Sequence, residues 1–136
     1  MLPKTDWASL IPHAGTMCLL DAVQAWDERT IHAVSASHAR MDNPLRSADG
    51  LHAVHLAEYG AQAMAVHGAL LARARGLNPA RPGRLVSLRD VQLFEEYVDR
   101  LDGTLDVHAE CLYADDSGAQ YTFRVEYRGR VLASGR

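Results

Sequence analysis

The sequence predicts an α+β domain in which an antiparallel sheet of about six strands wraps around one long buried helix. Residues 51–72 (LHAVHLAEYGAQAMAVHGALLA) carry Ala, Leu, Val and Met on every side, a pattern typical of a helix buried over most of its circumference. Strand-like runs separated by short polar turns lie before and after this segment. Antiparallel strands on both sides of a lone helix indicate the α+β class, and residues 1–136 are expected to form a single domain.

The chain before the helix predicts a turn, two strands and a long loop. Residues 7–13 are expected to form a turn, and residues 17–27 and 30–37 have the apolar, β-branched composition of strands. Residues 38–50 contain Asn-Pro, Asp, Ser and Gly, and they predict a loop. A loop of about a dozen residues is uncommon in a compact domain and is often functional.

Local signals predict where the helix begins and ends. Its N-cap is expected around Ser47 to Asp49, and Gly76, with Pro79 beyond it, is expected to end it. Four strand-like runs joined by short turns follow: 84–97 (RLVSLRDVQLFEEY), 104–113 (TLDVHAECLY), 120–127 (QYTFRVEY) and 130–134 (RVLAS). One sheet around one helix leaves an edge or a face open, so we expect a dimer.

The composition is that of an ordinary soluble globular protein. Of 136 residues, 48% are hydrophobic and 23% are charged, and the net charge of −3 argues against nucleic acid as a partner. Cys18 and Cys111 are expected to be free buried thiols. The first ten residues lack an apolar secretory segment, and no run reaches the ~18 apolar residues of a membrane span. We therefore expect a cytoplasmic protein without a membrane partner.

Glu58 is the first candidate for a functional residue. It lies in the apolar helix, three residues after His55 and four before Gln62, so the three side chains are expected on roughly one face. Burial of an unpartnered carboxylate costs several kcal/mol or forces it to hold a proton. A protonated carboxylic acid is useful in catalysis, which makes Glu58 a site candidate.

Positive charge is concentrated at the end of the helix. Five arginines and no acidic residue lie between residues 73 and 89, whereas residues 90–126 hold ten acidic residues and two arginines. Such a segment indicates either a local anionic partner or a solvated helix end, where cations are favoured.

Two segments resemble a known enzyme family. Residues 10–13 (LIPH) followed by 18–23 (CLLDAV) resemble the opening of the 3-hydroxyacyl-acyl-carrier-protein dehydratases, in which a Leu-Pro-His element runs into a Leu-Leu-x-Asp strand. Residues 58–62 (EYGAQ) resemble the helix signature of the same enzymes. The stretch 43–70 is closer still to the small dehydratase-like subunits of bacterial aryl polyene pigment clusters. The resemblance implies the hot-dog fold, and after residue 84 it extends to the fold alone.

One element of the family pattern differs in this chain. The dehydratases place a catalytic His in a His-Phe-Pro element about fourteen residues before the Glu, followed by Pro-Gly at the helix start. Here Asn43 and Pro44 occupy the first element, and Asp49-Gly50 replaces Pro-Gly. The catalytic Glu carries over onto Glu58, whereas the nearest upstream histidine is His38, twenty residues before it.

The resemblance implies the chemistry of dehydration. A protonated Glu58 would give its proton to the departing hydroxyl, and His38 would take the α-proton, with His55 as the alternative base. Backbone N–H groups at the helix start, from Gly50 to His52, would polarise the thioester carbonyl. Expected substrate-binding residues are Gln62, His55, Asn43 and Gly50. Expected carrier-docking residues are Arg73, Arg75, Arg81 and Arg84.

No metal or cofactor is expected. His52, His55 and Glu58 drift by about 120° around a helix, which is a poor arrangement for one metal ion. The chain has no phosphate-binding Gly-rich loop, no G-x-S-x-G sequence and no C-x-x-C pair.

We therefore expect a dehydratase that converts 3-hydroxyacyl groups on acyl carrier protein into trans-2-enoyl thioesters, in fatty-acid or polyene-type biosynthesis. The alternatives are a non-catalytic partner subunit of a dehydratase, which the missing His-Phe-Pro element favours, a hot-dog acyl thioesterase, or a binding module for the carrier protein. The expected partners are acyl carrier protein and a second subunit, either an identical copy or a dehydratase paralogue.

Overall fold

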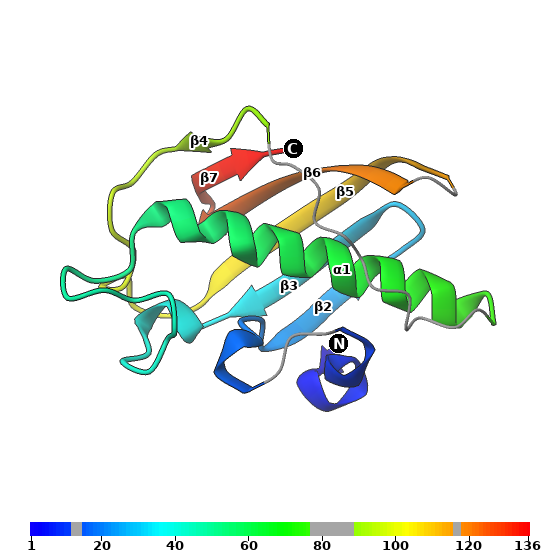
Figure 1. The fold of residues 1–136 in the computed structure, drawn as a ribbon, viewed down its shortest axis with the longest axis horizontal. Coiled ribbons are helices and arrows are strands. Elements are labelled where there is room, and N and C mark those ends of the chain that lie inside the picture. Colours follow the sequence, from blue (N-terminus) through cyan, green and yellow to red (C-terminus); the bar gives the residue numbers. More distant parts are fainter. Residues whose placement is uncertain (12–14, 77–88, 116–117) are drawn as a thin grey trace.

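One long helix lies across one face of an antiparallel sheet (Figure 1). The computed structural model describes residues 1–11, 15–76, 89–115 and 118–136. Within these residues the sheet has seven strands in the order β1-β2-β3-β5-β6-β7-β4. The predicted α+β architecture is confirmed. The strand count exceeds the expected six by one, because the N-terminal residues Leu2–Pro3 form an additional edge strand, β1.

The strands and helices have the following bounds. The strands are β1 Leu2–Pro3, β2 Ala22–Trp26, β3 Thr30–Ser35, β4 Gln92–Leu93, β5 Leu105–Asp115, β6 Gly118–Tyr127 and β7 Arg130–Gly135. The α-helix α1 is Leu56–Ala74, and short 3-10 turns occupy Lys4–Asp6, Ala8–Leu10, Gly15–Met17, Ser37–Ala39 and Ala53–His55.

The strand expected over 17–27 is shorter in the structure. The chain makes a 3-10 turn up to Met17, and β2 begins only at Ala22. The Leu19 N–H donates to the side-chain oxygen of Gln62 at 2.8 Å instead of to a neighbouring strand. Buried backbone groups must find a partner, and here a helix side chain supplies it.

The helix starts later than expected. The prediction of an N-cap between Ser47 and Asp49 is wrong, because residues 51–53 first pair with the segment that follows β4. The Val98 N–H donates to the Leu51 carbonyl, and the Ala53 N–H donates to the Glu96 carbonyl. α1 then begins at Leu56. Its predicted end is confirmed, since Arg75 is the C-cap and Gly76 follows with a φ of +72°.

The segment from β4 onward forms one edge of the sheet. The predicted strand over 84–97 lies partly outside the described residues, and only Gln92–Leu93 pairs with β7 as a strand. Beyond it, the Phe94 N–H donates to the Leu132 carbonyl, after which the chain turns to pair with residues 51–53. This edge therefore joins the sheet to the start of α1.

The core fills the space between α1 and the sheet. Alternate residues of β3 and β5 point toward the helix and are buried, including Ile31, Ala33 and Val107. Phe123 of β6 lies between two glycines, Gly60 on α1 and Gly135 on β7. A Cβ at Gly60 would lie 2.6 Å from the Phe123 ring, so only glycine permits this approach.

The expectation of two free buried thiols is confirmed for Cys18 and is wrong for Cys111. Both cysteines are free, but Cys111 is only half-buried, because the far half of β5 extends into solvent. Among the residues described, no helix combines the length and the apolar character needed to cross a bilayer.

The glycines of α1 provide a test of this packing. Gly60→Ala should lower the free energy of unfolding by about 1–3 kcal/mol, because the added methyl overlaps the Phe123 ring. Gly68→Ala is the matched control, since nothing lies within 4 Å of a Cβ there, and it should stabilise the helix by about 0.5–1 kcal/mol. Chemical denaturation of both variants measures the difference. Equal effects of the two substitutions would contradict the packing described here.

Candidate functional site

Glu58 lies in the first turn of α1, on the side opposite Gly60 and the sheet. Its side chain is half-buried in the single chain, whereas its neighbours Ala57 and Tyr59 are buried. His55 lies one turn before it and is also half-buried. The first turn of α1 therefore presents a carboxylate at the outer side of the helix, and the 3-10 turn directly before it carries a half-buried imidazole.

Gln62 is one turn further along α1 and is fully buried. Its Nε2 donates to the Met17 carbonyl at 2.6 Å, and its Oε1 accepts the Leu19 N–H. Gln62 thus holds the N-terminal segment against the helix. This contact accounts for its position on the helix without a ligand.

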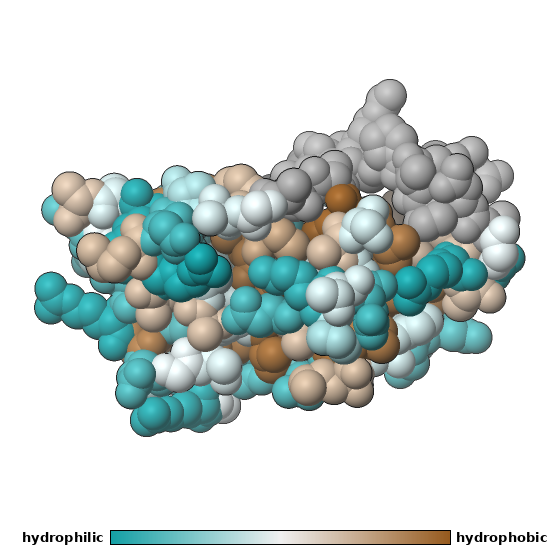
Figure 2. All heavy atoms as spheres, turned by 90° about the horizontal axis from the view of Figure 1, so that it is seen from below, coloured by the Kyte–Doolittle hydropathy of each residue, from teal (hydrophilic) through white to brown (hydrophobic). Residues whose placement is uncertain are grey.

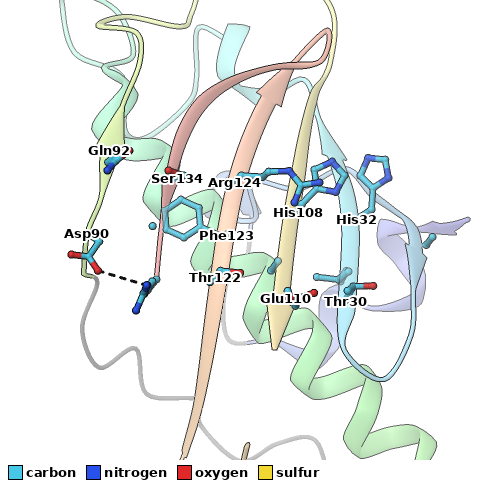
Figure 3. A pocket seen from close by; sticks show the side chains of 15 residues that line it. Thr30, His32, Asp90, Gln92, His108, Glu110, Thr122, Phe123, Arg124 and Ser134 are labelled. Carbon is cyan, nitrogen blue, oxygen red and sulfur yellow. Dashed lines mark ion pairs between the residues drawn. The ribbon is translucent and has the colours of Figure 1, made fainter. Parts of the chain in front are cut away.

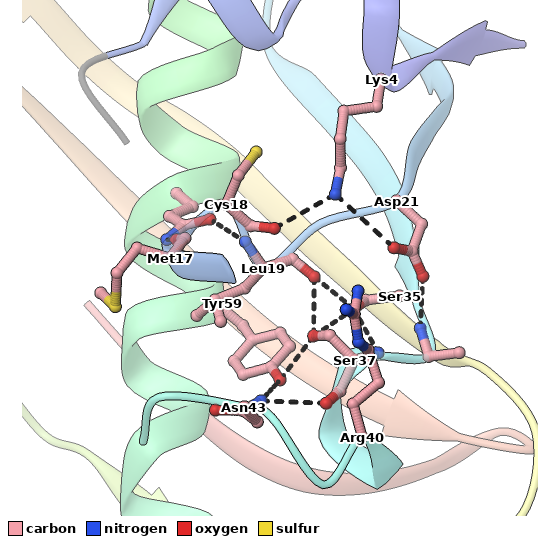
Figure 4. A network of polar contacts seen from close by, with 12 residues as sticks. Lys4, Met17, Cys18, Leu19, Asp21, Ser35, Ser37, Arg40, Asn43 and Tyr59 are labelled. Atoms are coloured by element: carbon pink, nitrogen blue, oxygen red, sulfur yellow. Dashed lines mark hydrogen bonds and ion pairs between the residues drawn. The ribbon is translucent and has the colours of Figure 1, made fainter. Parts of the chain in front are cut away.

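A buried polar network surrounds Tyr59 (Figure 4). The Tyr59 hydroxyl lies 2.7 Å from Ser37 Oγ and accepts a hydrogen bond from Asn43 Nδ2 at 3.0 Å. The second Asn43 N–H donates to the Ser37 carbonyl, and its Oδ1 accepts the Leu45 N–H. Asn43, for which a substrate-binding role is expected, is buried within this network.

Counting hydrogens gives the network a direction. The Ser37 hydroxyl has one hydrogen, and its Oγ lies 2.7 Å from the Leu19 carbonyl and 2.9 Å from Ser35 Oγ. The Tyr59 oxygen accepts from Asn43, and among the described residues the acceptor recorded within reach of its own hydrogen is Ser37 Oγ, so Tyr59 donates to Ser37. Ser35 also donates to the Leu19 carbonyl, at 2.5 Å. The chain of donors runs from Asn43 to Tyr59, from Tyr59 to Ser37, and from Ser37 to a backbone oxygen.

His38 follows directly after Ser37 and is completely buried. Its Nε2 lies 2.7 Å from the Leu101 carbonyl. Because a carbonyl only accepts, the proton is on Nε2 and the lone pair is on Nδ1. Nδ1 is buried and has no hydrogen-bond partner among the described residues. Burial lowers the pKa of His38, and the hydrogen bond to Leu101 opposes this effect in part.

The loop before the helix is held by Asp99. Its carboxylate accepts the Leu51 N–H at 3.0 Å and contacts Arg46 at 3.3 Å. The hydrogen bond from Leu51 lowers the pKa of Asp99. Gly50 has a φ of +117°, and a Cβ there would collide with this carboxylate. The N–H of Gly50 donates to the Ser47 carbonyl, so the amides of residues 50 and 51, expected to polarise a thioester, already have partners.

The outer face of the sheet carries a separate hollow of about 610 Å³ (Figure 3). Two of its lining residues, His32 and His108, have stacked rings with centroids 4.3 Å apart. His32 Nε2 lies 2.7 Å from Asp106, and His108 Nε2 lies 3.3 Å from Glu126. Glu58 does not line this hollow. The hollow and the candidate site therefore lie on opposite sides of the sheet.

The arginines expected to dock a carrier protein lie far from Glu58. Arg73 is exposed and donates to the Asp6 carbonyl at 3.1 Å, which fixes the N-terminal turns to the end of α1. Arg75 is exposed at the C-cap. Arg81 and Arg84 lie outside the described residues. Along the helix axis, residue 73 is about 22 Å from residue 58, at about 1.5 Å per residue.

Sequence reasoning missed Tyr59 and Ser37. The sequence signals were present but weak: a tyrosine in a helix otherwise rich in Ala and Leu, and two serines, Ser35 and Ser37, at the end of the expected strand 30–37. In the part of the chain that the structure describes, no group of three His, Cys, Asp or Glu side chains is arranged to hold a metal ion.

Comparison with protein families gives one match. The family model described as ApeP-like, ApeP dehydratase, matches residues 5–136. A comparison with curated proteins gives no match.

Solved structures with the same fold include a dehydratase complex and thioesterases. A chain of the dehydratase heterocomplex ApeI:P from Xenorhabdus doucetiae is 24% identical, with a TM-score of 0.85 over 100% of this chain and 88% of that chain. A phenylacetic acid degradation-related protein from Ralstonia eutropha is 11% identical and a thioesterase from Staphylococcus aureus 12%. Both structures align with this chain at a TM-score of 0.58, and each alignment covers 84% of this chain. The alignment covers 79% of the Ralstonia eutropha chain and 88% of the Staphylococcus aureus chain. These likenesses confirm the hot-dog fold.

Two buried histidines, His38 and His67, and the half-buried His108 predict how stability depends on pH. Burial lowers the pKa of His38, His67 and His108. Their folded-state pKa values lie below the unfolded value of about 6.5, so the unfolded chain binds more protons between pH 7 and pH 5. Stability should therefore be complete above about pH 6.5 and fall as the pH drops toward 5.

Urea denaturation at pH 7, 6 and 5 measures this change, and NMR titration of the imidazole protons assigns it to each histidine. A free energy of unfolding that is constant or higher at pH 5 would contradict the prediction. Asp99 does not interfere, because its pKa is lowered and it stays charged over this range.

Proposed function

The chain belongs to the ApeP-like dehydratase family, and from this we propose that it is a subunit of an enzyme that removes water from 3-hydroxyacyl groups held as thioesters on acyl carrier protein. The product is the trans-2-enoyl thioester, formed in a polyene-type or fatty-acid-type pathway. The observation that carries the proposal is Glu58, a half-buried carboxylate in the first turn of a helix that is otherwise nearly apolar.

The chemistry requires an acid and a base on one substrate. A protonated Glu58 gives its proton to the departing 3-hydroxyl while the C–O bond breaks, and a base removes the proton from C2. Electrons of the C2–H bond form the new double bond, so one water leaves and no cofactor is consumed. His38 suits the role of base in its protonation state, since its Nδ1 carries a lone pair and its pKa is lowered by burial.

The edge of the sheet at β4 supports a two-subunit site. Val91, Leu93, Phe94 and Tyr97 are exposed there, and we call these four residues the β4 edge. An exposed strand edge with large apolar side chains is a typical interaction surface. The opposite side of the molecule, with β2 and the N-terminal turns, presents separate hydrophobic groups with hydrophilic atoms between them (Figure 2). We propose that a second subunit pairs with the β4 edge and covers the side of α1 that carries Glu58.

A dehydratase paralogue is the proposed partner. The similar chain from Xenorhabdus doucetiae is part of a heterocomplex of dehydratase subunits. A partner of this kind would enclose Glu58, and it would also supply a base if His38 stays buried during the reaction. The complete burial of His38 is the observation that favours the second candidate function, a subunit that contributes Glu58 and shape while its partner contributes the histidine.

Roles remain to be proposed for His55, Gln62 and Asn43. His55 is proposed to contact the substrate beside Glu58. Gln62 and Asn43 are proposed to support the site through their hydrogen bonds to the Met17 carbonyl and the Tyr59 hydroxyl. The basic segment at the end of α1, with Arg75 exposed, is proposed to dock the acidic carrier protein. A thioesterase would release a free acid from the same thioester, so the product identifies the reaction.

Substitution of Glu58 tests the proposed function. In the complex with its partner subunit, Glu58→Gln should fold normally and lose about 100-fold or more in turnover, because the amide cannot donate the acidic proton. Absorbance of the enoyl thioester measures dehydration, and mass spectrometry detects free acid. Glu28→Gln is the control, since Glu28 is exposed in the turn between β2 and β3. Full dehydration by Glu58→Gln would remove Glu58 from the mechanism.

The β4 edge predicts which substitutions disrupt assembly. Phe94→Asp should weaken association with the second subunit at least tenfold, because a carboxylate replaces an apolar side chain at the paired edge. Leu112→Asp is a matched control, since Leu112 is 46% exposed and Phe94 is 55% exposed, but Leu112 lies on β5. Analytical ultracentrifugation at several concentrations compares the two. Equal association by both variants would place the interface elsewhere.

A further inference from the structure

We propose that Tyr59 and Ser37 act as positioning residues that hold Glu58 and His38 in a fixed relation. This inference rests on the proposed function, because it assigns a role to residues behind the proposed acid and base. Tyr59 follows Glu58 on α1, and Ser37 precedes His38 on the turn after β3. The hydrogen bond of 2.7 Å between their hydroxyl groups therefore joins the two backbone segments that carry the candidate acid and base.

The surroundings of Tyr59 and Ser37 allow this hydrogen bond only one arrangement of donor and acceptor. Tyr59 and Ser37 are both buried, so water does not compete for the contact. Asn43 donates to the Tyr59 oxygen, and Ser37 donates to the Leu19 carbonyl, which leaves one arrangement of donors around Tyr59. A hydroxyl with a donor on one side and an acceptor on the other cannot rotate without the loss of a bond. The first turn of α1 is thereby fixed relative to residues 37–43.

Further contacts fix the other side of each proposed catalytic residue. The His38 ring is held by the Leu101 carbonyl, and the Leu19 segment that receives Ser37 is held by Gln62 of α1. His38 is thereby tied to the segment before β5, and Leu19 is tied to α1. Burial raises the pKa of Tyr59, so its hydroxyl keeps its proton and remains a donor throughout the neutral range.

A matched pair of tyrosine substitutions separates positioning from general stability. Tyr121 is also a tyrosine whose hydroxyl contacts α1, at 2.6 Å from His67, about two turns beyond Tyr59. Tyr59→Phe and Tyr121→Phe each remove one hydroxyl and keep the ring, so both should lower the unfolding midpoint. Only Tyr59→Phe should lower kcat, on the order of 10-fold to 100-fold, since misplacement of a catalytic group by about 1 Å can cost up to 100-fold. KM should stay within about threefold.

A double-mutant cycle tests the specific pair. Ser37→Ala should lower kcat by a similar factor, and the double variant should lose little more than either single variant, because both remove the same hydrogen bond. Wild-type kcat in Tyr59→Phe, an equal loss of kcat in Tyr121→Phe, or fully additive effects with Ser37→Ala would each overturn the proposal.

Hydrogen exchange keeps the inference independent of the proposed function. In Tyr59→Phe, the amides of residues 37–38 and of residues 56–59 should exchange faster, and those around His67 should not change. If the wild-type complex dehydrates no thioester, the proposed function fails, and faster exchange in both segments would still support the connection between them. Unchanged exchange in either segment would overturn it.

Discussion

The carbonyl of Leu19 is the point on which the arrangement of this fold depends. It lies in the interior with two serine hydroxyls donating to it, while the N–H of the same residue donates to Gln62. A buried polar group without a partner costs about 1–3 kcal/mol, so each of these groups requires the others. The result is that the N-terminal segment, the end of β3 and the first two turns of α1 meet in one position. The first turn of α1 is oriented by polar contacts, although most of the helix surface is apolar.

The sequence predicted those features that depend on local pattern. The periodicity of β3 and the antiparallel pairing of β5 with β6 and of β6 with β7 followed from alternating side chains and from the polar residues between the runs. The end of α1 followed from Gly76, because a positive φ favours glycine. The start of α1 could not be predicted in this way, since it depends on pairing between residues 51–53 and 96–98, more than forty residues later in the chain.

In the candidate site, too, some features depend on local sequence and others on contacts between distant segments. Glu58 could be found from the sequence because a carboxylate in an apolar helix is unusual at any position. The role of Tyr59 could not, because its partners Ser37 and Asn43 are 22 and 16 residues away, and a tyrosine in a buried helix is ordinary. His38 was identified by residue type, but its complete burial and its bond to Leu101 required the fold. Contacts between distant segments therefore carry most of the information about how the site is supported.

The direction of the Tyr59 chain has a consequence for proton movement. Its donors run from Asn43 through Tyr59 and Ser37 to the Leu19 carbonyl, and a carbonyl has no proton to pass on. The chain therefore ends inside the protein and cannot deliver protons to Glu58 or remove them from His38. After each dehydration, the acid must regain its proton and the base must lose one by another route. Glu58 faces away from the sheet, so that exchange takes place on the outer side of α1, through water or through the subunit that covers it.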